Sequence, residues 1–298
     1  LALGTGSGGS GSLTLAGGLT ATNAANVTVG GGRVILESDL AVNGTGAFTL
    51  TGGTLQLGNN TATGSINGGL AFNATAGSLI FNRSDNATYS GVFSGTGSLT
   101  QAGTGNLTLT SANTYTGVTT VSAGTLTLDS GASLASSGFT TAAGATLALN
   151  ASTTVTTLSG FGNIQIGSGA TLTLNNSTNQ TLGNGLATSS TSTGSITGAG
   201  TFVKSGTGLL YVQGDFSSTT TNVTLSGGSF QFVGSSGADT NAFGTGTITV
   251  TANSTLNTFT DATRTKSSRL LNAIVVTGGT LALGTGSGGS GSLTLAGG

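Results

Sequence analysis

Proline, cysteine, methionine, tryptophan and histidine are all absent from this chain of 298 residues. Charge is scarce as well, because only 4% of the residues are Asp, Glu, Lys or Arg, against about 25% in an ordinary globular domain. Amphipathic helices place charged residues and Gln on their solvent face, and Glu37 is the single glutamate of the chain. The composition therefore argues against helical and α/β folds.

The same absences narrow the function. Without Cys the chain has no disulfide framework, and without His it lacks the commonest general base and metal ligand. A net charge of −1 argues against nucleic acid as a partner, and no apolar run approaches the ~18 residues of a membrane-spanning helix. We therefore expect no cofactor, no metal site, no nucleic-acid partner and no membrane-spanning segment in this chain.

Glycine is abundant, with 56 residues, and short apolar pairs recur between Gly-rich stretches. Each pair has a period of two, with Thr, Gln or Ala between its members, which is typical of a strand with one buried face. The pairs return roughly every 20 residues, which is typical of the coils of a solenoid. They are Leu107/Leu109, Leu126/Leu128, Leu147/Leu149, Leu172/Leu174, Leu210/Val212, Phe230/Phe232 and Ile248/Val250.

The pattern predicts an all-β fold, a parallel β-helix (β-solenoid) with about 20 residues per coil and uncapped ends. Stacked coils place like residues in ladders about 4.8 Å apart, so charged ladders would repel each other and Pro would remove a ladder donor. Both constraints account for the composition. A string of β-sandwich domains is the competing all-β interpretation, but it would bring more aromatic core residues and visible linkers.

The segment LALGTGSGGSGSLTLAGG occurs twice without change, at residues 1–18 and at residues 281–298. This identity predicts that residues 1–280 are one repeat unit and that residues 281–298 open the next identical unit. We therefore expect other copies of this sequence as partners, end to end along the solenoid axis and side by side in a filament.

The stretch GTGSLTQAGTGNLTLTSANTYTGVTTVSAGTLTL, residues 95–128, resembles the autotransporter-associated β-strand repeat, also called the passenger-associated transport repeat. A degenerate second copy covers residues 198–232, with Gly198, Gly200, Gly206 and Gly208 at the places of the first four glycines. The resemblance implies a right-handed β-helical passenger, bacterial and secreted or displayed at the cell surface, with an adhesive or structural role. The motif residues are Gly95, Gly97, Gly103, Gly105, Leu107, Leu109, Asn113, Tyr115, Gly117, Gly124, Leu126 and Leu128.

Two charged clusters are the candidate sites. Arg33, Glu37 and Asp39 alternate with apolar residues, which predicts that all three project from the outward face of a strand. Paired carboxylates could act as acid and base in a polysaccharide-cleaving enzyme, and loss of turnover on Glu37→Gln would reveal one. A solvated cluster of compensating charges is the far commoner arrangement, so we expect no catalytic residues.

The second cluster is the basic segment NTFTDATRTKSSR, which lacks strand alternation and is predicted to be a loop between coils. It could contact an anionic glycan or a cell surface. Its charged residues are Asp261, Arg264, Lys266 and Arg269.

The sequence therefore predicts an extracellular structural solenoid that builds a fibre, sheath, surface layer or adhesin stalk. The alternative is an adhesin module that recognises a glycan or host surface through its loops. Ice binding by outward Thr-x-Thr arrays is a third hypothesis, weakened because Ala148, Tyr211 and Gln231 interrupt the arrays.

Overall fold

The computed structural model describes residues 1–4, 11–17, 19–22, 26–43, 48–64, 66–67, 72–183, 194–213, 220–233, 244–258, 268–270, 272–285 and 293–295. These residues form two compact units, Leu1–Thr140 and Thr141–Gly298, each of which is described by itself. The described part of the chain contains strands, turns and bends but no helix, and therefore no helix that could span a membrane. The expected all-β class is confirmed.

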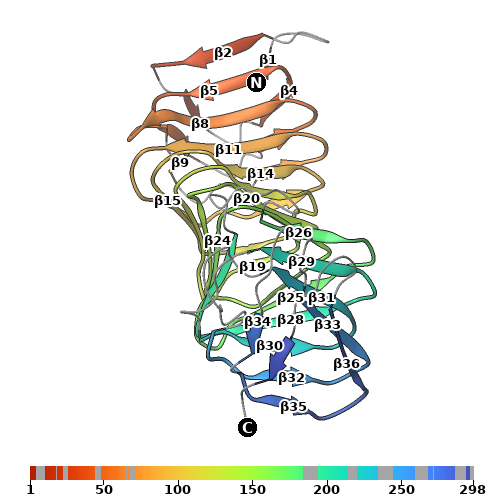
Figure 1. The fold of residues 1–298 in the computed structure, drawn as a ribbon. Helices are drawn as coiled ribbons and strands as arrows, with labels where there is room; N and C mark the ends of the chain where they lie inside the picture. Colours follow the sequence, from red (N-terminus) through yellow and green to blue (C-terminus); the bar gives the residue numbers. More distant parts are fainter. Residues whose placement is uncertain are drawn as a thin grey trace. The chain divides into compact units, whose positions relative to one another are not determined.

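In the first unit the chain winds through successive coils, and each strand pairs in parallel with the strand one coil away. Figure 1 shows β2, β5, β8, β11 and β14 lying one beside the next. One sheet has the order β1 (Ala2–Gly4), β4 (Val27–Gly31), β7 (Phe48–Leu50), β10 (Phe72–Ala74) and β13 (Phe93–Gly95). A second sheet has the order β2 (Ser12–Leu15), β5 (Arg33–Leu36), β8 (Thr54–Thr61), β11 (Ser78–Arg83), β14 (Ser98–Gln101) and β17 (Thr119–Val121).

The remaining strands of the first unit belong to three further ladders. These are β3 (Leu19–Thr22), β6 (Leu40–Asn43) and β9 (Ile66–Asn67); β12 (Ala87–Tyr89), β15 (Asn106–Leu109) and β18 (Thr125–Leu128); and β16 (Ala112–Asn113) with β19 (Ser133–Leu134). The strand β20 (Gly138–Thr141) spans the boundary between the two units.

The second unit repeats the same architecture with parallel ladders. One ladder is β22 (Thr153–Val155), β25 (Thr171–Asn175), β28 (Thr201–Ser205), β30 (Asn222–Leu225), β32 (Ile248–Val250) and β35 (Ile274–Val276). A second is β23 (Thr157–Gly160), β26 (Gln180–Leu182), β29 (Leu209–Gln213), β31 (Gly228–Val233), β33 (Ser254–Thr258) and β36 (Leu281–Thr285). The others are β21 (Thr146–Leu149), β24 (Asn163–Ile166) and β27 (Ser195–Gly198), and β34 (Ser268–Leu270) with β37 (Leu293–Leu295).

The structure is thus a parallel β-solenoid with about 21 residues per turn, as the spacing of the apolar pairs predicts. In the first unit, side-chain hydrogen bonds between coils join residues 17 to 25 apart. In the second unit the separation reaches 32 to 34 residues, because more residues lie between the paired strands β24 and β27. The solenoid therefore keeps its strands in register while the connections vary in length.

The apolar pairs face inward and build the core. Leu107 lies in register with Leu126, and Leu109 with Leu128, and each of the four is at most 1% exposed. Complete burial of one such side chain contributes roughly 1.5–3 kcal/mol to the stability of the folded chain. A single coil covers these side chains only in part and neighbouring coils cover the rest, so one coil alone has no complete core.

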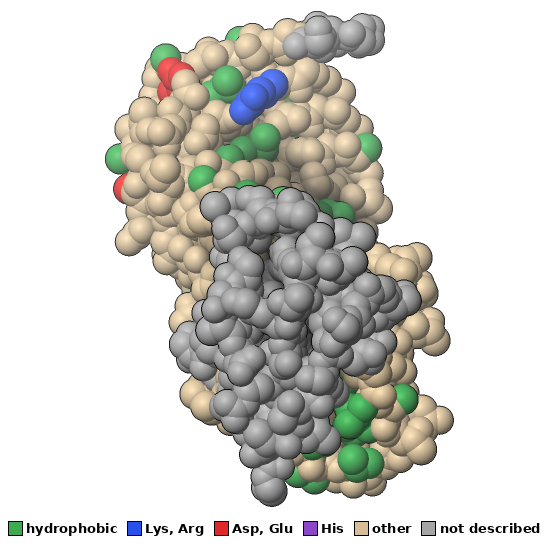
Figure 2. All heavy atoms as spheres, in the orientation of Figure 1, with side chains coloured by type: hydrophobic (Ala, Val, Ile, Leu, Met, Phe, Trp, Pro, Cys, Tyr) green, Lys and Arg blue, Asp and Glu red, His purple; other side chains and the backbone are tan. Residues whose placement is uncertain are grey.

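The outward ladders consist mainly of Thr, Ser and Asn in register. Thr88 lies beside Thr108, and Ser78 shares a 2.8 Å hydroxyl hydrogen bond with Ser98 of the next coil. Figure 2 shows that the described surface on its visible side carries few charged side chains. Identical charges on these ladders would stand opposite each other at every coil, so the stacking explains the low charge of the chain.

This explanation predicts a coupling between Thr88 and Thr108. The double variant Thr88→Lys/Thr108→Lys should be less stable than the sum of its single variants by about 0.2–1 kcal/mol, because like charges then stand opposite each other. The matched variant Thr88→Lys/Thr108→Glu should show coupling of the opposite sign. Urea unfolding of the singles and doubles measures both. Equal coupling in the two doubles would contradict the register.

Candidate functional site

The basic loop predicted as a surface contact lies largely outside the described residues. This applies to Asp261, Arg264 and Lys266, so the structure gives them no geometry. The backbone of Arg269 lies in β34 and pairs with Thr294 of β37. The surface contact through this loop therefore remains a prediction from the sequence.

The cluster of Arg33, Glu37 and Asp39 does not lie on a single strand as the alternation predicts. The chain bends after Leu36, where β5 ends, and Asp39 precedes β6. This bend is a corner of the coil, which interrupts the alternation and separates Arg33 on the strand from the two carboxylates beyond it.

The side chains of Arg33 and Glu37 form hydrogen bonds between coils. Arg33 donates a hydrogen bond through Nη2 to the Gln56 side chain, and Glu37 accepts one from Asn59 Nδ2 at 2.9 Å. Both partners belong to the following coil, around β8 and its end. The polar groups of Arg33 and Glu37 therefore tie successive coils together.

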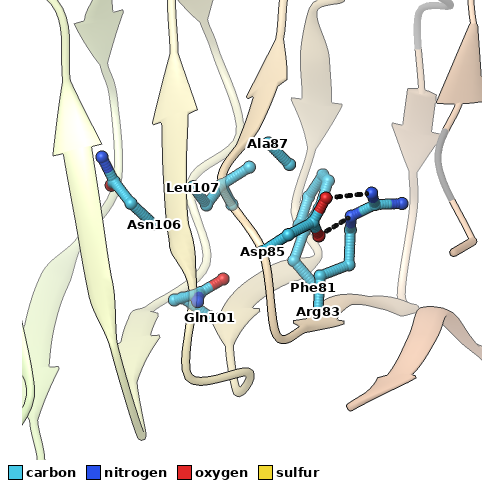
Figure 3. Close-up of a pocket in the computed structure, with 7 residues that line it drawn as sticks. All are labelled: Phe81, Arg83, Asp85, Ala87, Gln101, Asn106 and Leu107. Atoms are coloured by element: carbon cyan, nitrogen blue, oxygen red, sulfur yellow. Dashed lines mark hydrogen bonds and ion pairs between the residues drawn. The ribbon is translucent and has the colours of Figure 1, made fainter. Parts of the chain in front are cut away.

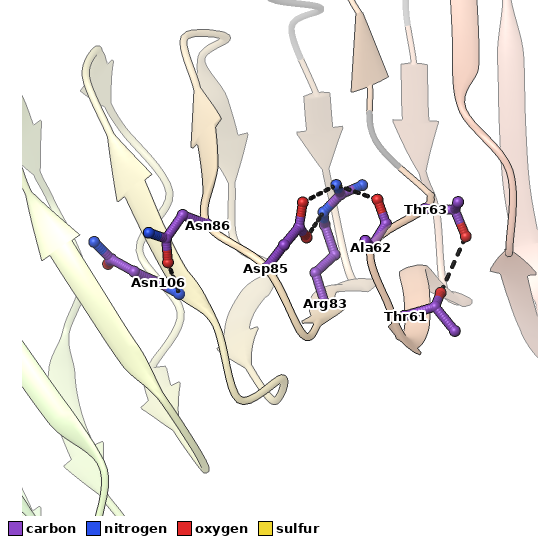
Figure 4. A network of polar contacts seen from close by, with 7 residues as sticks. All are labelled: Thr61, Ala62, Thr63, Arg83, Asp85, Asn86 and Asn106. Atoms are coloured by element: carbon purple, nitrogen blue, oxygen red, sulfur yellow. Dashed lines mark hydrogen bonds and ion pairs between the residues drawn. The ribbon is translucent and has the colours of Figure 1, made fainter.

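A charged pair that the sequence patterns do not reveal lies at the end of β11, whose last residue is Arg83. Arg83 is 9% exposed and forms a two-pronged ion pair with Asp85, with Nε–Oδ1 and Nη2–Oδ2 distances of 3.0 and 2.9 Å. Its Nη2 also donates to the carbonyl oxygen of Ala62 in the preceding coil at 2.6 Å, so the guanidinium joins two coils (Figure 4). These hydrogen bonds hold the pKa of the Asp85 carboxyl below its ordinary value of 3.8.

The only feature of the sequence that indicates an inward position for Arg83 is the alternation of inward and outward residues along the strand. It follows Leu79 and Phe81 at steps of two, which places it on the inward side of β11. Figure 3 shows the depression beside it, lined by Phe81, Arg83, Asp85, Ala87, Gln101, Asn106 and Leu107. The Asp85 side chain at its rim is 40% exposed, and both of its carboxylate oxygens are bound to Arg83.

Two further buried polar side chains occupy equivalent places in the two passenger-like segments. Gln101 and Lys204 each follow an inward apolar residue and precede a Gly-x-Gly corner. The Gln101 amide donates to the carbonyl oxygens of Gly103 and Gly105 at 2.9 and 3.0 Å. It thereby binds two corner carbonyl groups from inside the coil, and the Gly105 carbonyl oxygen also accepts the Thr125 amide of the next coil at 3.1 Å.

Lys204 performs the same task with a cation. It lies in register between Leu174 and Leu225 and has no exposed surface. Its Nζ donates to the carbonyl oxygens of Ser205 at 2.7 Å, Gly206 at 3.1 Å and Gly227 at 3.5 Å. Burial lowers the pKa of the ammonium group to about 8, because desolvation disfavours the charged form.

The other motif residues also serve the coil. Asn113 accepts a 2.8 Å hydrogen bond from the Phe93 amide and donates to the Ser111 carbonyl at 2.9 Å. The Tyr115 hydroxyl shares a 2.6 Å hydrogen bond with Thr119, and its ring centroid lies 4.7 Å from that of Phe93. These contacts assign Asn113 and Tyr115 to holding the turn in place.

The motif glycines mark places where coils approach each other closely. A Cβ on Gly105 would lie 1.9 Å from the carbonyl oxygen of Asp85, and one on Gly117 would lie 2.2 Å from that of Gly97. Any side chain there would force the coils apart. Leu107, Leu109, Leu126 and Leu128 are the core residues described above.

The described ranges contain no candidate metal site. Within them, no three Asp, Glu, His or Cys side chains are grouped so that they could hold a metal ion. The polar side chains that the structure describes at these corners are engaged mainly with backbone carbonyls and neighbouring coils.

These features define a parallel β-solenoid whose motif residues support its own stacking. Residues 99–128 match the family described as the passenger-associated transport repeat, and this confirms the resemblance. A 189-residue stretch, 61% of this chain, is 34% identical to the adhesin BmaC autotransporter of Brucella suis biovar 1 (strain 1330). The match spans only 5% of that protein's length. No solved structure matches the chain.

The buried ammonium of Lys204 predicts a pH effect on stability. In the unfolded chain this Lys keeps a pKa near 10.5, whereas in the folded chain the pKa is about 8. Between these values the unfolded state binds more protons, so stability should rise with pH, by up to about 1.4 kcal/mol per pH unit. Urea unfolding of the wild type from pH 7.5 to 9.5 measures the rise.

The control is Lys204→Gln, because Gln101 shows that an amide can satisfy the same kind of corner. The unfolding free energy of this variant should lack the rise. The buried Tyr89 and Tyr115, whose pKa values burial raises, are common to both proteins and cancel in the difference. Parallel pH curves for the two proteins would contradict the assignment of Lys204.

Proposed function

We propose that this chain is a structural segment of a bacterial passenger protein that is secreted and displayed at the cell surface. The observation that carries the proposal is the passenger-associated transport repeat at residues 99–128, which coincides with fully stacked coils. The similarity to part of a protein named an adhesin autotransporter supports the same location. In this function the chain acts as a stalk or filament segment.

The mechanism is mechanical. Every coil is held to its neighbours by parallel backbone hydrogen bonds and by a shared apolar interior, so a pulling force along the stack is distributed over several strand ladders. Polar groups add ties between coils, as in the bonds from Arg83 to Asp85 and to Ala62. A segment built this way can hold a binding region away from a cell surface.

The polar contacts favour a structural over a catalytic role. The carboxylates of Glu37 and Asp85 are each bound to a neighbouring side chain, Asn59 and Arg83 respectively. A general acid or base has to reach a substrate proton, whereas both carboxylate oxygens of Asp85 are bound to Arg83. We therefore assign these groups to stability.

The finer proposal concerns assembly. The identical segments at residues 1–18 and 281–298 support an array of 280-residue units along one axis. Such an array would build a fibre, a sheath, a surface layer or a long adhesin stalk. Other copies of this sequence are then its partners along the axis.

A second candidate function is a binding module. The relative's name contains the word adhesin, and the segment with Arg264, Lys266 and Arg269 is the one basic cluster of this sparsely charged chain. A cationic loop attracts anionic glycans through long-range electrostatics. In this alternative the solenoid presents the loop to a glycan or a host surface.

An adhesion assay separates the two functions. Beads coated with the full chain are tested for retention on an immobilised anionic glycan, with the triple variant Arg264→Ser/Lys266→Ser/Arg269→Ser beside the wild type. The structural function predicts equal, background-level retention of both. The control Arg264→Lys/Arg269→Lys keeps the charge.

Strong retention of the wild type and of the Lys control, with loss in the triple Ser variant, would establish the binding module instead. Retention would then also fall with added salt, because exposed charges are screened within about 8–10 Å. Background-level retention of the wild type, the triple Ser variant and the Lys control would leave the structural function as the account, because the loop then binds no glycan.

A further inference from the structure

The repeated segment pairs with different neighbours at its two positions. At residues 1–18, the strand β1 pairs with β4 and the strand β2 pairs with β5. At residues 281–298, the same residues form β36, which pairs with β33, and β37, which pairs with β34. One sequence therefore carries two sets of strand partners, one that follows it in the chain and one that precedes it.

The two sets of partners use opposite edges of the strand. The Leu1 carbonyl oxygen accepts a hydrogen bond from the Thr28 amide at 2.8 Å, in the coil that follows. The carbonyl oxygen of Thr280, directly before the second copy, accepts one from the Ser254 amide at 2.9 Å, in the coil that precedes. Successive carbonyl groups of a strand point to opposite edges, so a single copy can make both sets of bonds at once.

The inward face is the same at both positions. Leu3 lies in register with Val29, and Leu283 lies in register with Leu256, and both partners have no exposed surface. Leu283 itself is 44% exposed, because a coil covers it on one side only. A copy stacked on both sides would bury this leucine as fully as its partners.

We propose that the two strands of this repeated segment belong to a junction coil, the shared last coil of one unit and first coil of the next. Its first strand continues the ladder of β33 into the ladder of β4, and its second strand continues the ladder of β34 into that of β5. The occupant of the open edge is thus a second copy of this sequence, joined in one polypeptide. This inference rests on the proposed array of units and specifies how two units join.

The test uses a two-unit polypeptide, residues 1–280 followed by residues 1–298, with pairs of cysteines in a chain that otherwise has none. One variant carries Thr255→Cys and Ala282→Cys, which lie in register on the preceding side. The other carries Ala282→Cys and, in the second unit, Thr28→Cys, which corresponds to the pair of Ala2 and Thr28. Directly opposed residues are close enough for a disulfide.

Both pairs should form disulfides on mild oxidation at rates similar to the reference pair Thr28→Cys/Thr49→Cys within one unit. The control pairs Ala282→Cys with Thr49→Cys of the second unit, two coils away, and should not react. Formation of the first and reference pairs without the second would overturn the junction coil. Failure of the reference pair as well would also count against it, since the stack itself would then be wrong.

This outcome is separate from the surface function. Cross-linking in the purified two-unit chain does not depend on secretion, adhesion or a glycan. A chain that forms both disulfides but also binds glycan beads would keep the junction coil and replace the structural function. Formation of the first disulfide alone would overturn the junction coil. The proposed role as a structural passenger segment would be unaffected.

Discussion

The constraint on which the rest of the structure depends is that every coil must be hydrogen-bonded and covered by the coils next to it. One turn of the chain encloses too little apolar surface to stand alone, so stability is shared between neighbours. The in-register leucines of β15 and β18 show this directly, because each is covered by its counterpart in the adjacent coil. The absence of proline and the scarcity of charge follow from the same requirement, since both would act against stacked parallel strands.

Corners are the places where this requirement is hardest to meet, and there the chain uses its few functional side chains. At two corners Gln101 and Lys204 bind backbone carbonyl groups from inside the coil. Arg83 does so from a neighbouring coil, through its bond to Ala62. The charged and amide side chains of these residues thus donate hydrogen bonds to backbone carbonyl groups, which agrees with the structural function proposed for the chain.

The sequence predicts the regular part of this structure well and the corners poorly. Period-two apolar pairs such as Leu107/Leu109 identify the strands, because burial of one face determines the pattern. The same rule fails at Glu37, where a bend replaces the expected strand, since alternation carries no information about where a coil turns. Lys204 and Arg83 are also missed as buried residues, because a charged side chain is ordinarily exposed. For Arg83, the carbonyl partner Ala62 also lies 21 residues away in sequence.

Amide hydrogen exchange measured along the whole chain tests the stacked-coil account most directly. If coils stabilise each other, the amides of inner strands such as β15 and β18 should exchange only through cooperative opening of several coils, with protection close to that of global unfolding. Amides of Leu107 and Leu126 would then respond together to a substitution in either strand. Fast, independent exchange at these two amides would contradict the account, because it would mean that each coil opens without its neighbours.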